Sequence, residues 1–334
     1  MTQLEINKPD PGEHLGTPHE QQDQEPCSKL KKEAEKISQD EQGLLPEELV
    51  EVPTFLNTAC CDAELIEEAR SLLRERYAKN PDCFYKSDVD LILSDDWTMS
   101  RFLLRCRQDP RRSVDLVESA AKFRKQFKMG EAKPCDFPAE IYQVGGIFQY
   151  EPDRVGNVTM WMRAKFHRRC NELSHLMKQF ILCTMEQCDK MCGGRGVSVV
   201  FDLTDCGLKN ADPNLLFWLL NSFRNYCPKG LSYIIVYNLP WVLNATCSLA
   251  LSWLSSTNRK RLRFIQGDQI TKFIAPENLP DFVQGGLCKS DYRRVPENCQ
   301  PASVRPHQSL VPISESMVKR LQELHERFTS QESS

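Results

Sequence analysis

Apolar residues follow two different patterns along the chain. Between residues 62 and 130 they recur at the spacing of amphipathic helices, which predicts four short helices in an amino-terminal lobe. From about residue 145, short apolar runs that favour strands alternate with helical stretches. This alternation predicts an α/β fold, with a mostly parallel sheet flanked by helices over residues 131–290.

Five segments carry the strand pattern. The first two are separated by a turn and predict a hairpin, and the third and fourth are apolar on both faces, as in buried parallel strands. Because both faces are apolar, the sequence leaves open which face points toward a cavity. The segments are 147–150, 158–164, 197–203, 232–238 and 261–265.

The two ends of the chain are more polar. Residues 1–61 are rich in charged residues, Gln and Pro, and we expect a disordered arm. Residues 291–334 predict a Pro-rich linker and a short amphipathic tail helix, Glu315–Phe328. We expect this helix either to dock on the domain or to bind a protein partner.

No charged residue occurs between Gly230 and Asn258. The length permits a membrane-spanning helix, but Pro240 interrupts the segment and its first half is β-branched and aromatic. We therefore expect a buried strand and then an apolar helix over residues 240–254. That helix has no clearly polar face, so it is either a fully buried core helix or a lid over an apolar cavity whose outer face meets a membrane.

Four cations follow the apolar helix directly: Arg259, Lys260, Arg261 and Arg263. An apolar helix next to cations is typical of a surface that lies on anionic lipid, although a charge run is often only a solvated face. The net charge of −3 and the pI near 6.1 argue against a dedicated nucleic-acid-binding protein. No secretory signal is recognisable, so we expect the 15 cysteines to be reduced and the protein to be cytoplasmic.

Candidate catalytic patterns are weak. The spacing Cys-x5-Arg occurs at residues 106–112 and 288–294, but neither stretch contains the glycine of a phosphate-binding loop. Cys183, Cys188 and Cys192 share one predicted helix without a Cys-x2-Cys pair. We therefore expect no enzyme activity, no catalytic residues, no metal site and no cofactor.

Three motifs resemble one family in the right order. The chain resembles the CRAL-TRIO, or Sec14-like, family over about residues 62–290. The closest resemblance is to the CRAL-TRIO region of motile-sperm-domain-containing proteins, through residues 201–208 and 238–245. The motifs are Arg101–Arg105 (RFLLR), Tyr226–Trp241 (YCPKGL…IIVYNLPW) and Glu277–Pro280 (ENLP) followed by Gly285-Gly286.

The resemblance implies a lipid-binding domain, in which the sheet lines a hydrophobic cavity and a mobile helix gates it. Phosphoinositides, other phospholipids, tocopherols and retinoids are ligands of the family. We expect the cavity to be lined by Val199, Phe201, Ile235, Leu243, Cys247, Ala250 and Leu254. The other gate residues are Trp241, Val242, Leu249, Leu251 and Trp253.

The sequence departs from the family at three points, of which one is Cys227 in place of the second Tyr of the family's pair. Lys229 stands where yeast-type phosphatidylinositol transfer members often carry Glu, so phosphatidylinositol is less favoured as the cavity ligand. The motile-sperm domain and membrane anchor are not recognisable, so we do not expect tethering to contact-site partners.

Two hypotheses therefore remain. The first is a soluble lipid carrier that encloses a hydrophobic lipid and docks reversibly on anionic, phosphoinositide-containing membranes through the basic run. The second is an adaptor that uses the same fold with little or no lipid exchange.

Overall fold

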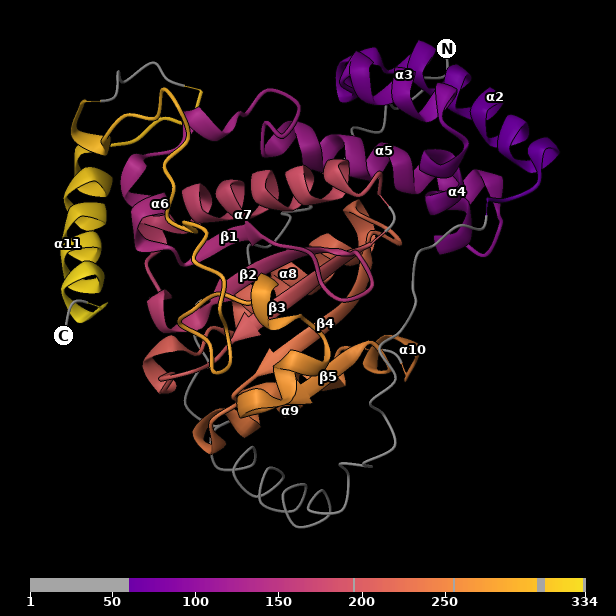
Figure 1. Ribbon diagram of the computed structural model, residues 1–334. Coiled ribbons are helices and arrows are strands. Elements are labelled where there is room, and N and C mark those ends of the chain that lie inside the picture. Colours follow the sequence, from indigo (N-terminus) through magenta and orange to yellow (C-terminus); the bar gives the residue numbers. More distant parts are fainter. Residues whose placement is uncertain (1–59, 195, 255, 305–309, 333–334) are drawn as a thin grey trace, which may run out of the picture. The chain divides into compact units, whose positions relative to one another are not determined.

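Four helices form the amino-terminal lobe, as the apolar spacing predicted (Figure 1). Asp95 and Asp109 cap two of them, because their carboxylates accept the backbone N–H of Thr98 at 2.7 Å and of Arg112 at 3.0 Å. Their apolar faces meet in a core of their own. The helices are α2 (Ala63–Lys79), α3 (Lys86–Ser94), α4 (Asp96–Arg105) and α5 (Pro110–Gln126).

The computed structural model describes residues 60–194, 196–254, 256–304 and 310–332. Apart from its last two residues, the predicted polar arm at 1–61 lies outside the described residues.

A five-stranded sheet follows, in the spatial order β1-β2-β3-β4-β5. The first two strands are antiparallel and the other neighbours are parallel, which confirms the predicted hairpin and the mostly parallel α/β fold. The strands are β1 (Ile147–Tyr150), β2 (Val158–Arg163), β3 (Val197–Asp202), β4 (Leu231–Tyr237) and β5 (Leu262–Ile265).

Helices cover the sheet unevenly. α7 (Asn171–Met191) and α8 (Pro213–Tyr226) pack on one face, where they bury the amino-terminal halves of β2, β3 and β4. On the other face, Trp161, Ile235 and Tyr233 pack against the segment 270–283. The short α6 (Ala139–Val144) precedes the sheet.

The uncharged stretch forms a strand and a helix, as expected. β4 is followed by a 3₁₀ turn, Trp241–Leu243, and then by α9 (Asn244–Ser252) and α10 (Ser256–Arg259). Among the described residues, no helix is both long enough and apolar enough to cross a membrane.

The predicted tail helix is α11 (Glu315–Glu332), which runs alongside α6 and also packs on α7 (Figure 1). Leu321 is buried in this contact, and Phe328 is buried against Phe166. Of the two expectations for this helix, the structure shows docking on the domain.

A buried ion pair joins the lobe to the sheet. The Arg101 guanidinium on α4 donates to both carboxylate oxygens of Asp189 on α7, at 2.8 and 2.9 Å, and its Nε donates to the carbonyl of Pro228 at 2.8 Å. Arg101 is only 8% exposed. A Cβ on Gly194 or Gly230 would lie within 2.7 Å of the Arg101 guanidinium, so these two glycines leave the room that the pair needs.

We expect Arg101→Ala to lower the free energy of unfolding by about 3 kcal/mol, because it leaves the Asp189 carboxylate, which is only 18% exposed, without its cation. Urea denaturation measures this change. Lys86→Ala is the control, since Lys86 pairs with Asp90 on the exposed surface of α3 and should change stability little. If the two substitutions lower the free energy of unfolding equally, the Arg101–Asp189 ion pair does not stabilise the contact between the lobe and the sheet.

Candidate functional site

An apolar cavity of about 530 Å³ lies on the face of the sheet that carries α7 and α8. Its walls come from α7, α8, α9 and α11, and its floor comes from the strands. The volume falls within the roughly 300–1,000 Å³ of small-molecule sites.

One row of side chains forms the floor. Met162, Phe201, Val236 and Phe264 are paired across β2, β3, β4 and β5 and all line the cavity. The neighbouring row toward the amino ends of the strands begins with Met160 and Val199, which are fully buried under α7 and α8. The cavity therefore begins where α7 and α8 no longer pack directly on the strands.

Five of the seven residues predicted to line the cavity do so: Phe201, Leu243, Cys247, Ala250 and Leu254. Val199 lies on the same face but one row inward, within the packed core. Ile235 lies on the opposite face, because side chains alternate along a strand, and its neighbours Ile234 and Val236 line the cavity instead.

The predicted gate helix covers the cavity without being buried itself. Within α9 only Ala250 is buried, so the segment is not the fully buried core helix of the first alternative. Leu251 also lines the cavity, whereas Val242 and Leu249 are half-buried outside it. Trp241 is 81% exposed, and Trp253 packs edge-on against Phe217 with ring centroids 5.1 Å apart.

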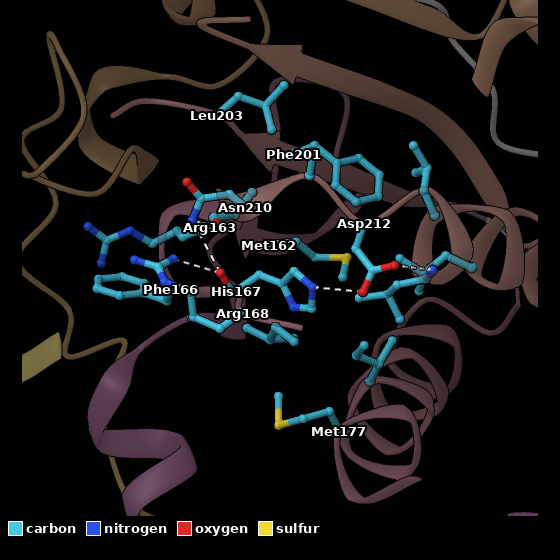
Figure 2. Close-up of a pocket in the computed structure, with 18 of the residues that line it drawn as sticks. Met162, Arg163, Phe166, His167, Arg168, Met177, Phe201, Leu203, Asn210 and Asp212 are labelled. Atoms are coloured by element: carbon cyan, nitrogen blue, oxygen red, sulfur yellow. Dashed lines mark hydrogen bonds and ion pairs between the residues drawn. The ribbon is translucent and has the colours of Figure 1, made fainter. Parts of the chain in front are cut away.

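Polar side chains gather at the end of the cavity between β2, α7 and α8. The His167 ring points toward Asp212, and Nε2 lies 3.0 Å from Oδ2 (Figure 2). Burial lowers the pKa of His167 below its usual value of 6.5, and the Asp212 carboxylate offsets this only in part. The other Asp212 oxygen accepts the N–H of Leu215 at 3.0 Å and caps α8.

This polar end was not predicted from the sequence. Residues 167–171 and 210–214 belong to separate connections, and the fold brings them together at the cavity. The one local signal is the run His167-Arg168-Arg169 between a strand and a helix. α11 adds a further wall that was not predicted, with Leu321, Leu324, His325 and Phe328.

The basic run is only partly a surface patch. Arg259 and Lys260 are exposed, whereas Arg261 and Arg263 are half-buried. Arg261 donates to the carbonyl of Leu231, and Arg263 donates to those of Lys260 and Leu262. Burial lowers the pKa of Lys229, and the neighbouring cations Arg261 and Arg105 lower it further. Lys229, the residue that departs from the family motif, therefore lies among other cations on this side of the domain.

A second, polar cavity of about 600 Å³ lies at the carboxyl ends of β2, β3 and β4. Arg163 and Asp202 both line it, with Nε 3.8 Å from the carboxylate. The Arg163 guanidinium also lies 3.8 Å from the centre of the Phe282 ring. Acidic and basic side chains thus face each other here.

The structure bears on two candidate kinds of site, a metal site and a catalytic cysteine. No group of three or more metal-ligating side chains occurs in the part of the chain that the structure describes. Cys106 lies between α4 and α5, where burial raises the pKa of its thiol and so disfavours the reactive thiolate.

Comparisons with known proteins agree with this fold. Residues 142–285 match the family model described as the CRAL/TRIO domain. A CRAL-TRIO domain-containing protein of Schizosaccharomyces pombe is 22% identical over 218 residues, which are 61% of this chain and 48% of that protein. The chain thus spans about half the length of this curated relative.

The crystal structure of Sfh5 has a TM-score of 0.50 at 13% identity, covering 80% of this chain and 100% of that chain. This likeness shows a common fold.

Two large aliphatic residues test where the core ends and the cavity begins. Ile235→Ala should cost about 2–5 kcal/mol of unfolding free energy, because Ile235 is fully buried. Leu251→Ala should cost clearly less, because its side chain faces a space already open. Urea denaturation of both variants measures this, and a Leu251 cost equal to that of Ile235 would contradict an open cavity.

Proposed function

Because residues 142–285 form a CRAL-TRIO domain, we propose that this protein binds a hydrophobic lipid in the apolar cavity and exchanges it with membranes. Proteins with this domain are generally non-enzymatic lipid binders. The observation that carries the proposal is the apolar floor row, which lies open under α9. An adaptor with a vestigial cavity has no need of this space.

The lipid leaves the cavity while α9 lies on a membrane. Each methylene exposed to water costs roughly 0.8 kcal/mol, so a passage through water is slow. Around α9, the Trp241 and Phe217 side chains are exposed, at 81% and 48%. Exposed aromatic residues next to an apolar helix suit the interface of a bilayer.

The cations after α9 bring this side of the protein to anionic membranes, including those that contain phosphoinositides. Arg259 and Lys260 are exposed, and Arg261 and Lys229 add charge nearby. Each such cation contributes about 1 kcal/mol of attraction to anionic lipid. The protein therefore acts in the cytoplasm and binds membranes reversibly.

The adaptor hypothesis remains as the second candidate. The tail helix was a candidate for a partner surface, but its buried residues Leu321 and Phe328 pack on the chain's own domain. An adaptor role therefore has to use other surfaces.

Ala250→Trp tests the cavity. Ala250 lines it from α9, so an indole at this position fills part of the space that a lipid needs. We expect transfer of fluorescent phospholipids between liposomes to fall at least about tenfold. Ala245→Trp is the matched control, because Ala245 lies on the exposed side of the same helix. If both variants transfer at the normal rate, or the unaltered protein transfers no lipid, the adaptor hypothesis is preferred.

Arg259→Ala with Lys260→Ala tests membrane docking. Two cations at about 1 kcal/mol each predict a loss of about 30-fold in binding to anionic liposomes at low salt. The loss should shrink as salt is raised, because exposed charges are screened. Arg111→Ala with Lys289→Ala removes two exposed cations elsewhere and is the control. Unchanged cosedimentation of the first variant would remove the basic run from the docking surface.

A further inference from the structure

The charges that line the apolar cavity are unbalanced. Among the described lining residues, Asp212 is the one carboxylate, against Arg168, Arg169 and Lys178, while the remaining cation, Arg163, lies 3.8 Å from Asp202 of the second cavity. Both Asp212 oxygens are already used, one by His167 and one by the N–H of Leu215. The cavity wall is therefore positive at this end.

Arg168 is held in place by groups that carry no full charge. Its Nη1 donates to the carbonyls of Lys165 and His167, at 2.8 and 2.7 Å, and its guanidinium lies 5.2 Å from the centre of the Phe328 ring on α11. No carboxylate of the described residues forms an ion pair with it. Burial, and then Arg327, lower its pKa, which is the direction expected for a cation that lacks an anion nearby.

Arg169 lies beside Arg168 but is more exposed and forms a long ion pair with Asp212. Its Nε donates to the carbonyl of Ala211 at 3.0 Å and is 4.0 Å from the nearer Asp212 oxygen, beyond hydrogen-bond distance. The amino end of α7 lies at the same place, because Cys170 and Asn171 line the cavity and Cys170 makes no side-chain cap. The partial positive charge of a 21-residue helix adds to that of the two arginines, and Glu172 in its first turn offsets part of it.

We propose that the cavity selects amphiphiles with an anionic headgroup, whose carboxylate or phosphate oxygens bind Arg168 and Arg169 at the amino end of α7. The alkyl chain lies on the floor row of Met162, Phe201, Val236 and Phe264 and reaches toward α9. α11 supports this subsite, because Phe328 packs on the Arg168 guanidinium and on Phe166. The inference rests on the proposed lipid binding and names the chemical class of the lipid.

Three ligands that share a twelve-carbon chain and differ only in the headgroup test this proposal: dodecanoate, dodecyl phosphate and dodecanol. Binding is measured by calorimetry on the full chain at neutral pH and low salt, below the concentration at which each ligand aggregates. We expect dodecanoate or dodecyl phosphate, or both, to bind at least about tenfold more tightly than dodecanol, since hydrogen bonds to charged groups are stronger than neutral ones. The tighter of the two anions identifies the headgroup.

Arg168→Gln with Arg169→Gln should bring the anions to within about threefold of dodecanol, while dodecanol binding stays the same. Unchanged dodecanol binding shows that the variant cavity is intact. Should the double variant fail to fold, Arg169→Gln alone gives the same comparison, because that side chain is 61% exposed. Arg111→Gln with Lys289→Gln is the charge-loss control.

The outcomes separate this inference from the proposed function. If dodecanol binds as tightly as the anions, or if the arginine variant weakens all three ligands equally, anion selection is wrong and lipid binding stands. If none of the three ligands binds and liposome transfer is also absent, the proposed function fails as well.

Discussion

A parallel sheet must bury both faces, and in this protein the helices bury only part of one. The amino-terminal row that begins with Met160 and Val199 is sealed by α7 and α8. The next row, from Met162 to Phe264, forms the floor of the cavity, which α7, α8, α9 and α11 surround without filling it. Open apolar surface of this kind is costly in water, at roughly 25 cal/mol per Å², so it favours an apolar occupant. The cavity, the apolar character of α9 and the exposed Trp241 all follow from this incomplete cover.

The two ends of α7 have different tasks. At the carboxyl end, Asp189 accepts hydrogen bonds from Arg101, which also donates to the carbonyl of Pro228 shortly before β4. These contacts fix the helical lobe against this part of the domain. At the amino end, Cys170 makes no side-chain cap, and Arg168 places a cation beside the apolar floor. Because one rigid helix carries both, the junction that stabilises the fold also sets the geometry of the polar end. An amphiphilic cavity results, with a charged end and an apolar end.

Much of the fold follows from the sequence, because strand and helix periodicities are local. The hairpin, the buried strands and the strand-then-helix division of the uncharged stretch were all predicted. The inward face of the strands was not predictable, because Ile234, Ile235 and Val236 are all apolar and only the register across the sheet separates them. The polar end was missed for a related reason. His167 and Asp212 are 45 residues apart, and no local pattern in the sequence indicates that the fold brings them together.

Native mass spectrometry of the protein purified from cells tests most directly whether the cavity holds a lipid. The account predicts a mass above that of the 38.5 kDa chain by one bound lipid, which collisional activation releases. The Ala250→Trp protein should lose this adduct and the Ala245→Trp protein should keep it. An adduct-free mass for the unaltered protein, under conditions that preserve a known lipid–protein complex, would contradict the account.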